Sequence, residues 1–263
     1  MNAHSEPLGE AASGDFVQSL ARGLAVIRAF DAEYPELSLS EVSRRAGIPA
    51  AAARRFLRTL ETLGYVRSDG RTFALTPRVL ELGFSYLSAL SLPEVMQPHL
   101  ERLSRETGES VSAAVLAGDE IVYVARVPTR RIMTIGITIG TRFPAHATSM
   151  GRVLLAALPE VQRDEVLARA PMEALTERTV IDADCLRAEL GRVREDGWAI
   201  VDGELEIGLR SAAAPVRRRD GSVAAAVNVS TSASRESLAR LRDEHVPRLL
   251  ETTAAITEDL RHV

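Results

Sequence analysis

The residues best suited to ligand chemistry form one basic region near the start of the chain. Seven arginines and two acids lie between residues 44 and 71, which gives this segment a net charge of +5. The remainder is acidic, because residues 79–263 hold 22 arginines and 27 acids and the whole chain has a net charge of −4. Guanidinium groups pair with phosphates and with the edges of guanine bases. A small basic region in an acidic protein therefore indicates a compact binding site for a polyanion.

The position of the arginines matters more than their number. All 32 basic residues are arginine and the sequence contains no lysine, which is typical of the codon bias of a GC-rich genome. Arginine content is therefore weak grounds for nucleic-acid binding, and the clustering is the stronger observation.

Three of the clustered arginines fall on one face of a predicted helix. Pro49 suits a first helical turn, and the apolar pattern predicts a helix from there to Leu63. At about 100° per residue, one side collects Ala52, Ala53, Phe56, Leu60 and Leu63, and the other collects Ala51, Arg54, Arg55, Arg58 and Thr62. A solvated charged face is the commoner explanation of such a pattern in an isolated helix, but the neighbouring elements reverse that preference.

The segments before this helix predict a helix-turn-helix. An apolar spacing at Leu20, Leu24, Ile27 and Phe30 indicates a first amphipathic helix that closes near residue 31. Ser38 or Ser40 can cap a second, short helix that runs through Arg45 and stops at Gly47. Two helices joined by a short glycine-containing turn form the helix-turn-helix pattern. In such a motif the second helix enters the major groove, and small residues at its start permit close approach.

A basic hairpin follows the arginine-bearing helix. Residues 65–66 and 72–75 are expected to be strands around the turn Ser68-Asp69-Gly70, with Arg67 and Arg71 beside it. Such a wing would touch backbone phosphates or the minor groove. The predicted DNA-binding residues are Ser40, Arg44, Arg45, Ala50, Ala51, Arg54, Arg55, Arg58, Arg67 and Arg71.

The rest of the chain predicts a second, mixed domain. A linker helix is expected over residues 78–92, and its stripe Leu80, Phe84 and Leu87 suits pairing with another helix or packing on its own domain equally well. Strands are expected at 110–116, 121–127, 134–139, 198–202, 211–217 and 223–231, and helices at 149–158, 182–195 and 235–260. The predicted fold class is α+β, with a tail at 1–15 expected to be disordered, a winged helix-turn-helix domain at 16–77 and a further domain at 93–263.

A second candidate site lies where the segment PAHATSMGR (residues 144–152) starts a helix. Thr148 or Ser149 can cap this helix, which leaves the backbone N–H groups of Ser149, Met150 and Gly151 near the positive end of its dipole. A small carboxylate could bind there, and Gly151 has no side chain to obstruct it. An ordinary helix start is the commoner meaning of such a segment.

The strand VAAAVNVST adds two buried polar candidates. Period-two alternation places Asn228 and Ser230 on one face, and both faces of the strand are largely apolar. Buried polar groups need partners, which either a ligand or internal hydrogen bonds can supply.

Signals of catalysis and of metal binding are absent from the sequence. It contains no GxSxG, Walker, HExxH or GxGxxG motif, and His99, His146 and His245 are too widely spaced for a zinc pair. Cys185 is the only cysteine, which excludes an internal disulfide. With no secretory signal and no long apolar run, the expected localisation is cytoplasmic, without cofactor, metal or membrane contact. The alternative to a DNA-binding protein is a small-molecule-binding or hydrolytic α+β enzyme with an accessory helix-turn-helix.

Nearly all of residues 16–260 resembles one family. The stretch from FVQSLARGLAVIRAFD through LSLSEVSRRAGIPAAAARRFLRTLETLGYVRSDGRTFALTPRVLELG is similar to the winged helix-turn-helix domain of IclR-family bacterial transcription regulators. HATSMGRVLLAALP and DGELEIGLRSAAAPV are similar to the effector-binding domain of that family. The opening FVQSLARGLAVIRAF and AAARRFLRTLETLGY resemble the branch that controls protocatechuate, 4-hydroxybenzoate and β-ketoadipate catabolism.

The resemblance implies a GAF-like effector domain, a dimer or dimer of dimers, and binding to operator DNA that a small carboxylic acid modulates. It implies effector contacts at His146, Ser149, Met150, Gly151, Asp202, Glu204, Arg210, Ser211, Asn228 and Ser230. His146 can equally be an ordinary loop histidine. This chain has Ser211 where some relatives have cysteine and Asn228 where some have serine, which leaves the identity of the acid open. Alanines at 212–214, 224 and 226 leave room for a ring or a six-carbon dicarboxylate.

Overall fold

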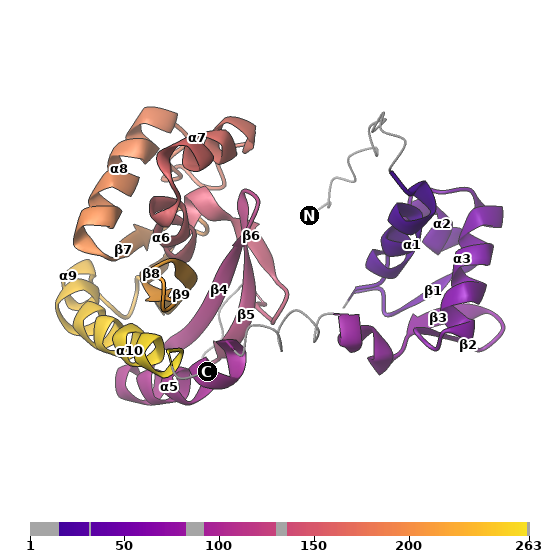
Figure 1. Ribbon diagram of the computed structural model, residues 1–263, viewed down its shortest axis with the longest axis horizontal. Coiled ribbons are helices and arrows are strands. Elements are labelled where there is room, and N and C mark those ends of the chain that lie inside the picture. Colours follow the sequence, from indigo (N-terminus) through magenta and orange to yellow (C-terminus); the bar gives the residue numbers. More distant parts are fainter. Residues whose placement is uncertain (1–15, 32, 83–91, 130–135, 262–263) are drawn as a thin grey trace. The chain divides into compact units, whose positions relative to one another are not determined.

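The computed structural model describes residues 16–31, 33–82, 92–129 and 136–261, and the chain divides into two compact units at residues 86 and 87 (Figure 1). This division falls within the predicted linker helix 78–92. The predicted tail at 1–15 and the positions Phe84 and Leu87 of the linker helix lie outside the described residues. Leu80, the remaining residue of that stripe, is exposed.

The N-terminal unit is a helix-turn-helix with a small sheet, as predicted. Its helices are α1 (Gln18–Arg28), α2 (Leu39–Arg45) and α3 (Ala50–Thr62), and a 3₁₀ turn, η1 (Pro77–Val79), follows the sheet. The sheet is antiparallel with the order β1-β3-β2, and its strands are β1 (Glu36–Ser38), β2 (Val66–Ser68) and β3 (Thr72–Leu75). Strand β1 was not predicted, because three residues are too few to show an alternation.

Local signals in the sequence place α2 and the turn before α3. Ser38 is the N-cap of α2 and forms a capping box, in which its Oγ accepts the Glu41 N–H and its own N–H donates to Glu41 Oε2 at 2.8 Å. Gly47 adopts a φ of +64°, which allows the chain to turn between α2 and α3 without steric cost.

The core of the N-terminal unit differs in part from the predicted stripes. Leu57 is fully buried, whereas Leu63 is half exposed because α3 has already ended there. On α1, Val26 rather than Leu20 or Leu24 supplies the buried contact, and both leucines are about half exposed or more. The apolar face of α1 is therefore only partly used within this unit.

The C-terminal unit contains a six-stranded antiparallel sheet with the order β6-β5-β4-β9-β8-β7. Its strands are β4 (Ser110–Ala117), β5 (Glu120–Val127), β6 (Arg142–Pro144), β7 (Ala199–Asp202), β8 (Leu209–Arg217) and β9 (Val223–Ser232). Helices α5 (Leu92–Thr107) and α10 (Val246–Asp259) pack on one face, and α6 (Ser149–Ala157) and α8 (Ala183–Asp196) pack on the other (Figure 1). The remaining elements are η2 (Ala145–Ala147), α7 (Glu160–Arg169), α9 (Leu238–Arg240) and the π-helical turn η3 (Leu241–His245).

Strand β9 is buried on both faces, as its sequence predicted. Val227 and Val229 belong to the core under α5 and α10, and Ala226 belongs to the core under α6 and α8. Because side chains alternate along a strand, Asn228 and Ser230 face the same side as Ala226. The start of α6 lies on that side as well.

One expectation about this unit was wrong, and helices α5 and α7 were not predicted. Residues 136–139, the described part of the expected strand 134–139, are not a strand; Thr138 N–H donates to Thr141 Oγ1 in a turn, and β6 follows at residue 142. Helix α5 was not predicted, because Pro93 and Pro98 argue against a helix there. Pro93 lies in the first turn, where its missing N–H costs nothing, and the burial of Met96 and Leu100 supports the helix around Pro98. Among the described residues, no helix is long and apolar enough to cross a membrane.

Candidate functional site

The exposed face of α3 is the first candidate site. Ala50, Ala51, Arg54, Arg55 and Arg58 are all exposed, while Ala53 and Leu57 bury the opposite face. The guanidinium groups of Arg54, Arg55 and Arg58 have no ion-pair or hydrogen-bond partner among the described residues. This face therefore presents three unpaired cations next to a small, unobstructed helix start, which suits contact with phosphates and base edges.

The predicted residues of α2 divide into two groups. Arg44 and Ser40 are exposed, and the Oγ of Ser40 lies 3.1 Å from the Oγ of Ser38. Arg45 is engaged inside the unit, because its Nε donates to the Ala29 carbonyl at 2.7 Å, its Nη2 pairs with Asp31 and its guanidinium lies over the Tyr34 ring. These contacts attach α2 to the end of α1.

The hairpin of β2 and β3 presents the two remaining arginines. Arg67 is exposed and pairs with Glu36 at 3.0 Å, and Arg71 is exposed at the turn. Asp69 shapes this turn by accepting the backbone N–H groups of Arg71 and Thr72, and these bonds lower the pKa of its carboxyl group. The turn therefore holds a fixed shape while both guanidinium groups stay at the surface.

A small cavity in the C-terminal unit is the second candidate site. It is lined by Tyr123, Ile137, Ala147, Thr148, Ser149, Val201, Leu205, Leu209, Ser211, Asn228 and Ser230. Four of the predicted effector-binding residues, Ser149, Ser211, Asn228 and Ser230, thus meet at one place. The cavity volume is about 20 Å³, which is roughly the space of one water molecule.

The polar groups of this cavity are only partly satisfied. Ser149 Oγ lies 2.8 Å from Ser211 Oγ, and Asn228 Nδ2 donates to Ser230 Oγ at 2.9 Å. Asn228 is 4% exposed, and its Oδ1 has no hydrogen-bond partner among the described residues. A buried polar atom without a partner costs free energy, so a ligand or water that completes this group is favoured.

The start of α6 borders the same cavity through Thr148 and Ser149. Thr148 caps the helix by accepting the Gly151 N–H at 3.1 Å, which leaves the N–H groups of Ser149 and Met150 without an intrahelical acceptor. Gly151 itself has another reason to be glycine. A Cβ there would lie 2.1 Å from the carbonyl oxygen of Ala145. Glycine is therefore needed so that the η2 turn can pack closely against α6, and this position does not face an open ligand space. Met150 is 1% exposed and packs in the core.

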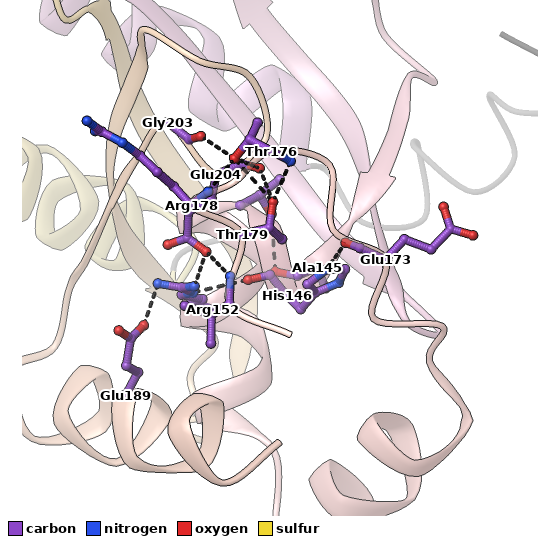
Figure 2. Close-up of polar contacts among 12 residues, drawn as sticks. Ala145, His146, Arg152, Glu173, Thr176, Arg178, Thr179, Glu189, Gly203 and Glu204 are labelled. Carbon is purple, nitrogen blue, oxygen red and sulfur yellow. Dashed lines mark hydrogen bonds and ion pairs between the residues drawn. The ribbon is translucent and has the colours of Figure 1, made fainter. Parts of the chain in front are cut away.

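The other predicted effector contacts do not line the cavity. Glu204 accepts from Arg152 Nη2 at 2.6 Å, and His146 lies with its Nε2 3.3 Å from the Glu173 carbonyl (Figure 2). Asp202 pairs with Arg210 Nε at 2.6 Å and with Arg178 Nη1 at 2.8 Å. Burial lowers the pKa of His146 and raises the pKa of Glu204. Met150 and Gly151 do not line it either. The roles of all ten predicted residues as effector contacts stay predictions.

Sequence reasoning missed the apolar part of the lining. Tyr123, Ile137, Val201, Leu205 and Leu209 come from three separate segments, and nothing in their local pattern separates them from core residues. Burial raises the pKa of the Tyr123 hydroxyl to about 12, so this group is neutral in the protein. An apolar lining around a few polar groups is typical of sites for small organic ligands. In the part of the chain that the structure describes, no cluster of His, Cys, Asp and Glu is arranged to hold a metal ion.

Comparisons with known proteins match both units. The model of the IclR helix-turn-helix domain matches residues 19–70, and the model of the bacterial transcriptional regulator IclR C-terminal domain matches residues 84–258. The Pca regulon regulatory protein of Pseudomonas putida is 46% identical over 94% of this chain and 84% of its own. The p-hydroxybenzoate hydroxylase transcriptional activator of Acinetobacter baylyi is 37% identical over 96% of this chain and 94% of its own.

A solved structure shows the same arrangement of elements. It is an IclR homolog from Microbacterium hydrocarbonoxydans complexed with 4-hydroxybenzoate, with a TM-score of 0.84, 28% identity, and coverage of 93% of this chain and 100% of that chain. The predicted fold class, a winged helix-turn-helix followed by an effector domain of mixed helices and sheet, is confirmed. The matched C-terminal model is that of a bacterial transcriptional regulator, and the two relatives are named a regulatory protein and a transcriptional activator, which confirms the prediction of a regulator over that of an enzyme.

Proposed function

Because the chain belongs to the IclR family of bacterial transcriptional regulators, we propose that it controls genes of aromatic-acid catabolism by binding operator DNA under the control of a small aromatic carboxylate. The names of its relatives support this pathway, since one is a Pca regulon regulatory protein and another is a p-hydroxybenzoate hydroxylase transcriptional activator. Because operator DNA is in the cytoplasm of a bacterium, we propose that the protein acts there.

The observation that carries the effector proposal is the partly satisfied cavity at the start of α6. A ligand carboxylate can accept the free N–H groups of Ser149 and Met150, where the helix dipole favours a negative charge. A second polar group of the ligand would then meet the amide of Asn228. That amide can present its oxygen or, after a flip, its nitrogen, and a ring hydroxyl suits both because it donates and accepts.

This chemistry favours a hydroxybenzoate over β-ketoadipate as the effector. A hydroxybenzoate combines one carboxylate with a neutral donor and acceptor at the far side of an apolar ring, which matches the apolar lining of Tyr123, Val201 and Leu209. β-Ketoadipate would place a second carboxylate in this lining, and burying an unpaired charge is costly.

The oligomer that we propose is a dimer or a dimer of dimers. Phe16, Leu20 and Leu24 recur at helical spacing along α1 and its start, and they are 46%, 63% and 49% exposed. Residues four apart lie on one helix face, so these side chains form an unpartnered apolar stripe that a second subunit could cover. Two winged domains in a dimer would read a pseudo-palindromic operator.

The test is binding of the purified full chain to the DNA upstream of its own gene at fixed salt, because phosphate contacts make the affinity salt-dependent. Arg54→Ala or Arg58→Ala should weaken specific binding by about 1–3 kcal/mol if each removes a base contact. Arg169→Ala, an exposed arginine on α7, serves as the control and should leave affinity unchanged. Normal operator affinity in both α3 variants would exclude α3 as the reading helix.

The effector is tested by adding protocatechuate, 4-hydroxybenzoate or β-ketoadipate separately to the operator complex. A change in operator affinity with one hydroxybenzoate supports the proposal. A response to β-ketoadipate alone would overturn the argument from Asn228, and no response to any of the three would remove the regulator from this branch of catabolism.

A further inference from the structure

A buried ion network lies behind the cavity of the proposed effector site. Arg152 follows Ser149 by one turn on α6 and is 3% exposed. Its guanidinium contacts three separate segments: Nη1 pairs with Glu189 of α8, Nη2 donates to Glu204 Oε2 at 2.6 Å, and Nε donates to the His146 carbonyl at 3.1 Å (Figure 2). One side chain therefore joins the helix that starts at the cavity to its neighbours.

Glu204 belongs to the β7–β8 loop, defined here as residues 203–208, which forms one wall of the cavity. Leu205 follows Glu204 directly, and Leu205 and Leu209 line the cavity. The base of the loop is closed by the Gly203 N–H, which donates to the Leu209 carbonyl at 2.8 Å. The contacts of the Glu204 carboxylate therefore fix the backbone directly beside Leu205, whose side chain lines the cavity.

A second loop fastens the β7–β8 loop from the outside. Thr176 Oγ1 donates to the Gly203 carbonyl at 2.7 Å, Thr179 Oγ1 donates to the Glu204 carbonyl at 2.7 Å, and the Val180 N–H donates to Glu204 Oε2 at 3.0 Å (Figure 2). These bonds and the bond to Arg152 all converge on residues 203 and 204. The loop lies outside the paired strands. Backbone hydrogen bonds fix its two ends at Gly203 and Gly208, and the contacts at residues 203 and 204 hold the side of the loop that adjoins Leu205.

An aromatic acid does not fit into the cavity in this conformation. A volume of about 20 Å³ holds roughly one water molecule, so at least one wall has to move before a ring can enter. The lining strands β5, β7, β8 and β9 are paired in the sheet, and eight of the nine residues of α6 are buried. Ile137, Ala147 of η2 and Leu205 of the β7–β8 loop line the cavity from outside these elements. Of these three segments, the β7–β8 loop is the one whose position an ion pair with α6 holds.

We propose that the Arg152–Glu204 ion pair holds the β7–β8 loop closed over the empty cavity, and that its separation admits the aromatic effector. This inference rests on the proposed function. It assigns Arg152 and Glu204 as positioning residues that set effector affinity without touching the effector. For a ligand that binds only the open state, the apparent affinity is the affinity of the open state multiplied by the fraction of molecules that are open. A larger open fraction therefore gives tighter binding.

The network is built so that this separation is feasible. Removing one partner of a buried ion pair is costly when the other is left without compensation. Arg152 keeps Glu189 and the His146 carbonyl when Glu204 leaves, so its charge stays paired. Glu204 is 7% exposed, so its carboxylate is poorly solvated when the loop is closed, and burial raises its pKa.

The decisive comparison is between Glu204→Gln and Glu189→Gln. Each removes one carboxylate charge from the same guanidinium, but only Glu204 lies on the loop. Stopped-flow and calorimetric binding of 4-hydroxybenzoate to the full chain should show Glu204→Gln associating at least about threefold faster and binding more tightly, because a larger fraction of molecules is open. Glu189→Gln should stay near the wild-type rate. Weaker or slower binding in Glu204→Gln would mean that the carboxylate holds the loop onto the bound ligand, and an unchanged rate would mean that the ligand enters elsewhere; either result overturns the proposal.

Hydrogen exchange of the ligand-free proteins separates this inference from the proposed function. Amides of residues 203–209 should exchange faster in Glu204→Gln than in the wild type and in Glu189→Gln. If the wild type binds none of the aromatic acids, the proposed function fails, while unchanged exchange in Glu204→Gln would refute the ion pair as the closing contact. Glu204→Asp keeps the charge but shortens the side chain that reaches Arg152 Nη2. It should change exchange in the same direction and supplies the test of the ion pair if Glu204→Gln does not fold.

Discussion

Replacing Gly151 by alanine should damage the C-terminal unit far more than an ordinary glycine-to-alanine change in a helix. An added Cβ would lie 2.1 Å from the carbonyl oxygen of Ala145, 2.4 Å from its Cα and 2.6 Å from its carbonyl carbon. These are backbone atoms of the η2 turn, and Ala145 is itself 1% exposed and donates its N–H to the Asp119 carbonyl at 2.9 Å. No flexible side chain is available to move aside.

The size of the effect follows from this geometry. Ordinary contacts between heavy atoms are about 3.5–4.0 Å, so the turn and α6 must separate by more than 1 Å. Overpacking of a dense core costs about 1–3 kcal/mol, and a clash with fixed backbone belongs at or above the upper end, at about 3 kcal/mol. For a unit of this size each kcal/mol lowers the melting temperature by about 2–4 °C, so we expect a loss of about 6–12 °C.

Thermal unfolding of the full chain measures this directly, with Gly191→Ala as the matched control. Gly191 lies within α8, and an added Cβ there has no atom within 4 Å, so alanine should be neutral or stabilising by up to about 1 kcal/mol. The Gly151→Ala variant should also lose its response to 4-hydroxybenzoate, because the shifted turn displaces Thr148 and Ser149. A melting temperature within about 2 °C of the wild type, with normal effector binding, would refute the argument from close packing.

Three further changes test the assignments of single side chains. Asn228→Leu removes a buried amide whose Oδ1 has no partner, so it should abolish the effector response while operator affinity and melting temperature stay near wild type; a normal response would remove this residue from the site. Burial lowers the pKa of His245, so the unfolded chain binds the proton first as the pH falls below about 6.5, and stability is lost as the pH falls towards the folded-state pKa. The urea midpoint should therefore drop less in His245→Leu than in the wild type between about pH 7.5 and 5.5, and an equal drop would contradict this. Arg45→Ala should destabilise the N-terminal unit by about 1–2 kcal/mol through loss of the Ala29 and Asp31 contacts, whereas Arg44→Ala should not; equal unfolding midpoints would show that these contacts are not stabilising.

The elements that the sequence predicts well are those with a complete local signal. The capping box at Ser38 and Glu41 and the turn glycine before α3 need no distant partner. Strand β9 is also predicted from its local sequence, because nearly every position from 223 to 231 is apolar or small. Helix α5 could not be predicted in this way. Its prolines oppose a helix locally, and only the packing of its apolar face on the sheet and on α10 compensates for them.

The candidate site was predicted in part for the same reason. Asn228 and Ser230 share a strand face, and Ser149 starts a helix, so local pattern alone marks them as polar groups in apolar surroundings. That these three meet Ser211 at one cavity depends on the pairing of β8 with β9 and on where α6 packs. Leu205 and Leu209 carry no local sign at all that they line a cavity.

The comparison of paired and unpaired polar groups explains which predictions concern binding and which concern stability. Arg45 and Arg54 are both arginines of the helix-turn-helix, yet Arg45 is held by a carbonyl, a carboxylate and a ring, whereas Arg54 has no partner among the described residues. Glu204 and Asn228 form the same contrast in the C-terminal unit, since Glu204 Oε2 accepts from Arg152 and Val180 and the amide oxygen of Asn228 has no partner among the described residues. A sequence records that a polar group is present but not whether it is already engaged. Neutralising an engaged group should therefore change stability or the position of a loop, and neutralising a free one should change the affinity for DNA or effector.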